Sequence, residues 1–270
     1  MNITKMINGI LPPAMKTLIR GTLSRFIGFV EVGSWAEAQK AVAGYESETA
    51  VESIIESIQQ AHASSNETKA LTSRDLQIIS SFAIAIASVG VSNTKIKVVD
   101  VGGAGGDYFF MFANAMPAVT FDWVVVETPA LATAITKTNL GGGKNIRWVS
   151  SLEEAGKDFD VALLSSVLQY VDDPYGLLNE VTNRCKVMVI NRIPLTSSET
   201  DQVTVQHVRT HGRRGAYPAW FFSNNVFLNE IDKVGDIVSR WAVPEDSHVL
   251  KFQQIESQGM VVNVVNRQQS

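Results

Sequence analysis

The sequence predicts an α/β protein: a doubly wound, Rossmann-like sheet with an N-terminal helical extension and a C-terminal antiparallel strand pair. From residue 96, short apolar runs alternate with helical segments, which is typical of parallel β-α units. Between about 33 and 90, apolar residues follow the helical spacing instead. We therefore divide the chain into a helical extension (1–90) and an α/β domain (91–270).

The extension contains signals for three helices. Ser34 lies three residues before Glu37, a capping box that starts the first helix. Apolar residues at i, i+3, i+4 and i+7 predict a second helix over 51–58 and a third over 76–86, joined by the polar loop 61–73.

The first thirty residues carry only basic charges. Lys5, Lys16, Arg20 and Arg25 precede the first acidic residue, Glu31. Three interpretations remain open: a surface segment packed on its own domain, a basic amphipathic stretch that makes peripheral contact with an anionic membrane, and a cleaved targeting peptide. A secretory signal is not indicated, because a continuous apolar core is missing from this stretch.

Five short apolar runs are the predicted parallel strands: 96–101, 121–127, 146–149, 159–166 and 186–191. Thr128 before Pro129 and Asp173 before Pro174 place a capping side chain ahead of a first-turn proline, so two helices begin there. The runs 237–243 and 259–266 form the predicted antiparallel pair.

Composition excludes several classes of function. The net charge of -4 disfavours a nucleic-acid partner. Cys185 is the only cysteine and the four histidines lack ligand spacing, so we expect a metal-free protein in a reducing, cytoplasmic compartment. The longest apolar run, 82–91, is too short to span a bilayer.

The stretch VVDVGGAGGDY (98–108) marks a ligand site, because a doubly wound sheet binds ligands at the carboxyl ends of its strands. Asp100 ends the first strand and is followed by Gly102 and Gly103, which permit a sharp turn close to a ligand. Glu127 ends the second strand, where an acid can accept hydrogen bonds from ribose hydroxyls. These residues predict an adenosine-containing ligand.

The turn favours S-adenosylmethionine over NAD(P). A dinucleotide fingerprint starting at Gly103 would place its third glycine at Tyr108, so the G-x-G-x-x-G pattern fails. Asp100 and Asp107 would repel a diphosphate, whereas Asp100 can accept a hydrogen bond from the ammonium group of a methionine moiety.

This pattern resembles that of class I S-adenosylmethionine-dependent methyltransferases, whose first motif reads D-x-G-x-G-x-G. Here the motif comprises Asp100, Gly102, Ala104 and Gly106, with alanine at the middle glycine. Glu127 falls at the family's ribose-binding acid, and FDVALLSSVLQYVDDP (159–174) is similar to the segment that lies beside the cofactor.

Five segments narrow the resemblance to a little-characterised methyltransferase subfamily associated with bacterial cell-surface polysaccharide synthesis. They are GSWAEAQKAVAGYES, DVGGAGGDYF, LQYVDDPYGLL, NRIPL and GAYPAWFFS, in this order over nearly the whole chain. The resemblance implies the fold, the cofactor and methyl transfer to a small acceptor, and it leaves the acceptor unidentified.

The cofactor site is predicted from four segments that follow strands, with structural turns, helix caps and loop polarity as the competing roles. Its residues are Asp100, Gly102, Gly103, Ala104, Glu127, Thr128, Ser150, Ser151, Ser165 and Ser166.

Five residues are candidates to act on the acceptor, and three of them form the predicted catalytic set. A hydroxyl acceptor needs a general base, for which His207 is the first candidate and His211 the second, with a surface histidine as the alternative for each. Gln169 and Tyr170 follow the fourth strand, where they can orient an acceptor, while a core position is the alternative for Tyr170. Arg192, at the end of the fifth strand, completes the catalytic set with His207 and Tyr170.

A basic cluster follows the fifth strand and is flanked by aromatic residues. It predicts an anionic acceptor such as a phosphate or a nucleotide-sugar, against the alternative of a solvated basic loop. Its members are Arg192, Arg209, Arg213, Arg214, Tyr217 and Trp220.

The predicted function is therefore methyl transfer from S-adenosylmethionine to a hydroxyl or phosphate oxygen of a sugar or nucleotide-sugar. An NAD(P)-dependent oxidoreductase and a catalytically inactive binding protein of the same fold are the alternatives. The oligomeric state is not fixed by the sequence.

Overall fold

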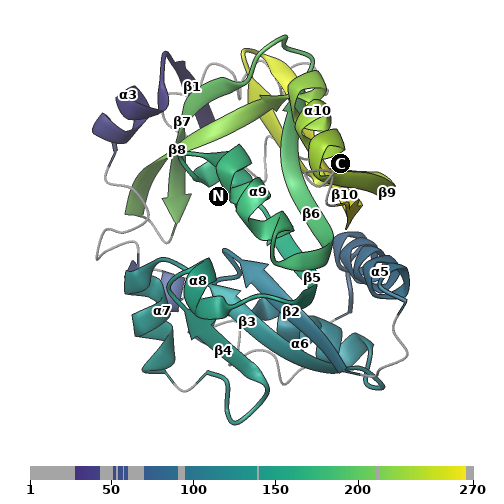
Figure 1. Cartoon of the computed structure of the whole chain (residues 1–270). Helices are drawn as coiled ribbons and strands as arrows, with labels where there is room; N and C mark the ends of the chain where they lie inside the picture. Colours follow the sequence, from purple (N-terminus) through teal and green to yellow (C-terminus); the bar gives the residue numbers. More distant parts are fainter. Residues whose placement is uncertain are drawn as a thin grey trace.

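The computed structural model describes residues 28–42, 51–52, 54–56, 58–59, 70–90, 95–138, 140–210 and 213–265 (Figure 1). The strands are β1 (Gly28–Val32), β2 (Lys95–Val101), β3 (Thr120–Val126), β4 (Ile146–Val149), β5 (Phe159–Ser165), β6 (Cys185–Thr196), β7 (Gln202–Thr210), β8 (Arg213–Ser223), β9 (Gly235–Leu250) and β10 (Gln253–Val264). The helices are α3 (Trp35–Lys40), α5 (Ser73–Ser88), α6 (Asp107–Ala115), α7 (Pro129–Thr136), α8 (Leu152–Ala155), the short 3-10 helix η1 (Leu168–Tyr170), α9 (Pro174–Thr182) and α10 (Asn224–Val234).

The main sheet has the order β4-β3-β2-β5-β6-β10-β9. The first five strands are parallel, while β10 is antiparallel to both β6 and β9. Both the predicted doubly wound sheet and the C-terminal antiparallel pair are thus confirmed. Strand order reverses between β2 and β5, which is where a doubly wound sheet opens a crevice for a ligand.

Helices cover both faces of this sheet, which explains why its strands are continuous apolar runs. Val99 and Val101 of β2 belong to a core formed with α8, α9 and α10, and Ile96 and Val98 belong to a second core formed with α5 and α6. Alternate residues of one strand therefore serve two cores.

A second, antiparallel sheet of β1, β7 and β8 joins the main one through β6. Strand β6 pairs with β5 as far as Asn191, and its last residues Leu195 and Thr196 pair with β8. In Figure 1 the β1–β7–β8 sheet (upper left) and the β9–β10 pair (upper right) lie on either side of β6. The sequence predicted neither β1 nor the β7–β8 hairpin.

The N-terminal extension is only partly helical. Residues 28–32 form β1, which pairs with β7. This short alternating run becomes a strand only when β7 lies beside it in the folded chain. The predicted helices are present as α3, as helical residues 51–59 with gaps at 53 and 57, and as α5. The basic segment before residue 28 lies outside the described residues.

Two capping predictions are only half right. Ser34 caps α3 by accepting from the Glu37 N–H, but Glu37 accepts from the Gly33 N–H rather than closing the box on Ser34. Helix α7 begins at Pro129 as predicted, yet Thr128 makes no side-chain cap hydrogen bond.

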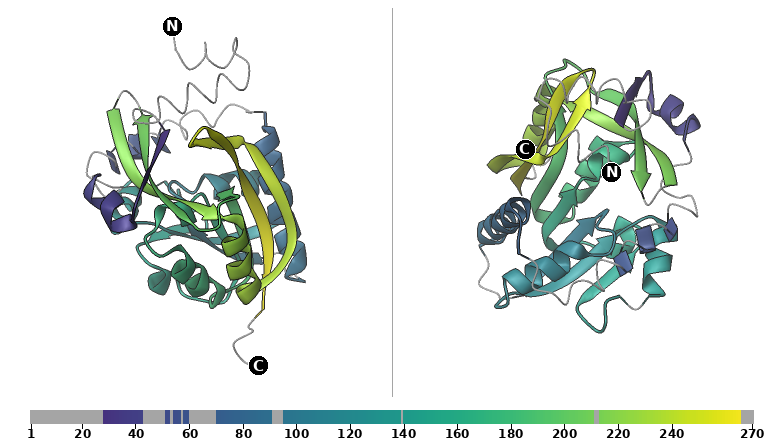
Figure 2. Two further views of the ribbon diagram at one scale, coloured as in Figure 1. Left: turned by 90° about the horizontal axis from the view of Figure 1, so that it is seen from above. Right: turned by 180° about the vertical axis from the view of Figure 1, so that it is seen from behind.

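The C-terminal pair is longer than predicted. Strands β9 and β10 continue through residues 244–258 and meet at a turn of Lys251 and Phe252, whose φ angles are +47° and +66° (Figure 2). Two positive φ angles match the twist of a two-residue hairpin. In the described parts of the chain, no helix is long and apolar enough to cross a membrane.

Candidate functional site

A cavity of about 710 Å³ lies at the carboxyl ends of β2, β3 and β5, at the switch point of the sheet. It is lined by residues from the core sheet, the N-terminal extension and β8. They are Trp35, Gln39, Val42, Ile54, Gly102, Ala104, Glu127, Thr128, Leu131, Ser166, Val167, Tyr170, Val171, Asp172 and Pro218.

Glycine is required at position 102 for two reasons. Gly102 has a φ of +71°, and a Cβ there would lie 2.8 Å from Cγ2 of Val167. Any side chain would strain the turn and close the gap between the loops after β2 and β5. A Cβ at Gly103 would overlap the carboxylate of Asp100.

Ala104 fits the turn despite replacing a glycine of the family motif. Its φ is +45°, and two hydrogen bonds hold its peptide groups: its N–H donates to Glu127 Oε1 at 2.8 Å, and its carbonyl accepts from Trp148 Nε1 at 2.8 Å. Ala104 also packs against the small apolar cluster around Ile58 and Leu131. These contacts offset the cost of a left-handed backbone at a non-glycine residue.

Glu127 reaches into the cavity from the end of β3. Its carboxylate accepts from the N–H groups of Ala104 and Thr128, at 2.8 and 3.1 Å. Burial raises the pKa of Glu127, and both backbone donors oppose that shift. A carboxylate has about four acceptor positions, so two remain for hydroxyls of a bound ligand.

Asp100 does not line the cavity. It is 1% exposed and lies under the glycine turn, where Oδ2 accepts from Trp123 Nε1 at 3.3 Å and Oδ1 has no hydrogen-bond partner. Burial raises its pKa to about 8; the Trp123 hydrogen bond opposes this, and the charges of Glu127 and Asp107 add to it. Contact between Asp100 and a cofactor stays a prediction.

The predicted serines divide into two groups. Ser151 caps α8, and Ser150 donates to Glu154 from both its N–H and its hydroxyl, so both serve a helix start instead of lining the cavity. Ser166 lines the cavity with a φ of +59°. Ser165 contacts the hydroxyl of Tyr108 at 2.9 Å.

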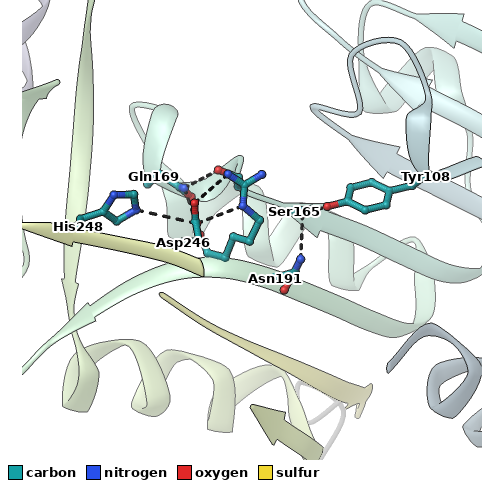
Figure 3. A network of polar contacts seen from close by, with 8 residues as sticks. Tyr108, Ser165, Gln169, Asn191, Asp246 and His248 are labelled. Atoms are coloured by element: carbon teal, nitrogen blue, oxygen red, sulfur yellow. Dashed lines mark hydrogen bonds and ion pairs between the residues drawn. The ribbon is translucent and has the colours of Figure 1, made fainter. Parts of the chain in front are cut away.

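A polar network extends from the loop after β5 to β9 (Figure 3). Gln169 donates from Nε2 to Ser166 Oγ at 2.9 Å and to the carbonyl oxygen of Arg192 at 3.2 Å. The Arg192 guanidinium forms a bidentate pair with Asp246, at 3.1 and 3.0 Å. His248 Nε2 lies 3.9 Å from the same carboxylate.

Arg192 is thus engaged within the protein. Its φ is +62°, and it directly follows Asn191, the last residue of β6 that pairs with β5. Burial lowers the pKa of Arg192, but the hydrogen bonds and charge of Asp246 outweigh burial and raise it overall. Arg192 is not among the lining residues of the cavity, and two of its five N–H donors are taken by Asp246.

Of the three predicted catalytic residues, only Tyr170 lines the cavity. Burial raises its pKa to about 12, so its phenol stays protonated near neutral pH. His207 lies on β7 between Gly28 of β1 and Ala216 of β8, and it is not among the lining residues.

Several predicted residues fall elsewhere. His211 and the side chains of Arg209, Arg213 and Arg214 lie outside the described part of the chain. Trp220 stacks on Trp35 instead of forming a free platform. Within the described ranges, no group of three His, Cys, Asp or Glu side chains could hold a metal ion.

Sequence reasoning missed the cavity residues Trp35, Gln39 and Ile54 and the network residues Asp246 and His248. The first three come from the extension, about fifty or more residues before the glycine turn, and the last two come from β9. Local signals were available for the extension residues: Trp35 and Gln39 lie in one of the recognised segments, and Ile54 lies in the predicted helix 51–58.

No family model and no curated protein matches this chain. Solved structures resemble it at low identity. The N-terminal domain of EvdMO1 with SAH bound is 15% identical, covering 72% of this chain and 83% of that one, with a TM-score of 0.48. A S-adenosylmethionine-dependent methyltransferase from Clostridium acetobutylicum is 11% identical, covering 72% and 92%, with a TM-score of 0.47. The PH0226 protein from Pyrococcus horikoshii is 12% identical, covering 72% and 93%, with a TM-score of 0.46. At these identities and scores the similarity assigns no reaction to this chain.

Proposed function

We propose that this protein is an S-adenosylmethionine-dependent methyltransferase that acts on a small acceptor, at a hydroxyl or phosphate oxygen of a sugar or nucleotide-sugar. One observation carries the proposal. A single cavity at the switch point joins the glycine turn after β2, the carboxylate that ends β3 and the loop after β5.

The residues present suit this cofactor. The turn at Gly102 lacks the Cβ that would close the gap to Val167, and Glu127 keeps acceptor positions for ribose hydroxyls. The charged residues among the described lining positions, Glu127 and Asp172, are both acidic. This charge attracts a cationic cofactor and opposes the diphosphate of NAD(P). Among the proposed acceptors it likewise favours an uncharged sugar over a nucleotide-sugar. When bound, the cofactor supplies a methyl group activated on a sulfonium centre.

The protein's own residues bind the cofactor and orient the acceptor. Glu127 and the turn hold the adenosine end, and Tyr170 orients the acceptor hydroxyl as a hydrogen-bond partner, because its protonated phenol cannot act as a base near pH 7. His207 remains the proposed base; if it acts in catalysis, His207→Ala lowers turnover by about two orders of magnitude and leaves cofactor binding intact. Unchanged turnover would exclude it.

Calorimetric titration with S-adenosylmethionine, S-adenosylhomocysteine, NAD and NADP tests the proposal. We expect binding of the first two ligands only. Binding of a nicotinamide cofactor instead would support the oxidoreductase alternative. Binding of none of the four would support a protein of this fold without catalysis.

The remaining proposals concern the protein's surroundings. A cytoplasmic location follows from the single cysteine, a role in cell-surface polysaccharide synthesis follows from the subfamily resemblance, and peripheral membrane contact follows from the basic N-terminus. Vesicle co-sedimentation of the full chain with anionic and with zwitterionic lipids tests the last of these.

A further inference from the structure

Gln169 is a buried polar residue inside a segment that lines the cavity. Ser166, Val167 and residues 170–172 are lining residues, whereas Gln169 is 3% exposed and is not one of them. Its Oε1 has no hydrogen-bond partner among the described residues. An unpaired buried oxygen costs free energy that an apolar side chain would avoid, so the compensating contacts of this residue are those of its amide nitrogen.

The amide nitrogen of Gln169 joins the ends of two neighbouring strands. It donates to Ser166 Oγ at 2.9 Å, directly after β5, and to the carbonyl oxygen of Arg192 in β6 at 3.2 Å (Figure 3). A carbonyl oxygen only accepts hydrogen bonds, so the nitrogen, and not Oε1, has to face Arg192. Both contacts therefore need a donor at position 169.

Both acceptors belong to residues with a left-handed backbone. The φ angles of Ser166 and Arg192 are +59° and +62°, a conformation that is strained for residues other than glycine and persists only where the surroundings hold it. The backbone N–H of Ser166 donates to the carbonyl oxygen of Asn191 at 2.9 Å, and the Gln169 amide adds a contact at its side chain. Gln169 thus helps to hold the strained backbone that follows β5.

Arg192 is a fixed point for this contact. Its guanidinium forms the bidentate pair with Asp246 of β9, and the preceding residue, Asn191, lies in register with Ser165 of β5. Because both its side chain and the backbone before it are held, the hydrogen bond from Gln169 ties Ser166 to a firmly placed strand end.

The backbone of Ser166 sets the position of the loop beside the glycine turn. Val167 follows Ser166 directly, and a Cβ at Gly102 would lie 2.8 Å from its Cγ2, so the two loops meet closely at the cavity. A ligand site tolerates displacements of only about 0.5 Å in the groups that form it. Relaxation of the strained Ser166 backbone would therefore alter the site.

We infer that Gln169 is a positioning residue of the cofactor site, whose side-chain amide holds Ser166 and so fixes the loop after β5 against the glycine turn. It acts through Ser166 rather than by orienting an acceptor itself. This inference rests on the proposed function, because the ligand concerned is S-adenosylmethionine.

The test measures the affinity of the full chain for S-adenosylhomocysteine by calorimetry. Gln169→Met keeps a side chain of similar size and removes the donor, and we expect the dissociation constant to rise about three- to tenfold. Thr182→Val is the matched control. It removes a buried hydroxyl that donates to the carbonyl oxygen of Asn179 at 2.7 Å in the last turn of α9, and Thr182 is not among the lining residues. Urea denaturation of both variants confirms that they are folded. A merely structural role of Gln169 would lower stability in both and leave both affinities unchanged.

Ser166→Gly tests how Gln169 acts. Glycine adopts a positive φ without strain and lacks the hydroxyl, so we expect Gln169→Met to weaken binding less in the Ser166→Gly background than in the unmodified chain. Equal effects in the two backgrounds would overturn the inference, as would an unchanged affinity in Gln169→Met.

A second variant covers the case in which Gln169→Met does not fold. Gln169→Asn keeps an amide but withdraws it by one methylene, so it cannot reach both oxygens, and the same two criteria then apply to it. If the unmodified chain does not bind S-adenosylhomocysteine, the proposed function fails and this inference fails with it. Binding by the unmodified chain with unchanged affinity in the variant removes the inference alone.

Discussion

The backbone N–H of Ala104 donates to Glu127 Oε1 at 2.8 Å, so the turn after β2 is tied to the end of β3. The same carboxylate is the ribose-binding candidate. Glu127 therefore holds the turn, and we propose that its remaining acceptor positions bind a ligand.

Replacement of Glu127 weakens cofactor binding. Glu127→Ala removes charge-assisted hydrogen bonds to the turn and to the ribose, and we expect the dissociation constant for S-adenosylhomocysteine to rise about 10- to 100-fold. Calorimetry measures the change. Glu153→Ala, which removes an exposed carboxylate in α8, is the control; equal affinities for the two variants would remove Glu127 from the site.

The helical segment 51–59 packs directly on the glycine turn. A Cβ at Gly105 would lie 2.8 Å from Cγ2 of Ile58, so Gly105→Ala forces the segment outward. We expect the free energy of unfolding to fall by about 1–3 kcal/mol, measured by urea denaturation. Combining Gly105→Ala with Ile58→Ala creates space for the new methyl group; if the two losses simply add, this contact is not the cause.

The Arg192–Asp246 pair contributes to stability through its partial burial. Asp246→Asn leaves the guanidinium uncompensated, and we expect a loss of about 1–3 kcal/mol in the free energy of unfolding. The double variant Arg192→Met/Asp246→Leu loses less, because neither charge stays buried alone. Glu230→Gln, which breaks the more exposed pair with Lys233, changes stability by less than about 1 kcal/mol. Equal losses of stability in Asp246→Asn and Glu230→Gln would contradict the effect of burial.

Asp100 makes stability depend on pH in the opposite direction from most carboxylates. Its pKa is raised from 3.8 to about 8 in the folded chain, mainly by burial, so between these values the native state binds the additional proton. The contribution of this group to the free energy of unfolding therefore falls as pH rises through that range.

Asp100→Asn removes this dependence. Between about pH 5 and about pH 8, we expect the wild type to lose stability relative to the variant as the pH rises. The loss in unfolding free energy is no more than about 1.4 kcal/mol per pH unit. Urea denaturation at several pH values measures both chains, and parallel pH profiles would contradict the assigned protonation.

Much of the fold could be predicted because its signals are local. The five parallel strands are near-continuous apolar runs. Ser34 and Asp173 mark helix starts through hydrogen bonds within one turn, and Pro129 marks one through its fixed φ angle. The sequence also identified the glycine turn and Glu127, because strand ends in a doubly wound sheet converge on one edge.

The rest of the site depended on contacts between distant segments. Gly28–Val32 is a strand only because β7 lies beside it, and Trp35 reaches the cavity only because α3 packs on β7. Asp246 pairs with Arg192 across a separation of 54 residues. The sequence by itself therefore determined the parallel strands, the glycine turn and the carboxylate at the end of β3, since backbone periodicity and glycine conformation are local properties. Only the tertiary structure decided which charges are neutralised and which donors remain free, because burial and pairing arise when remote segments meet.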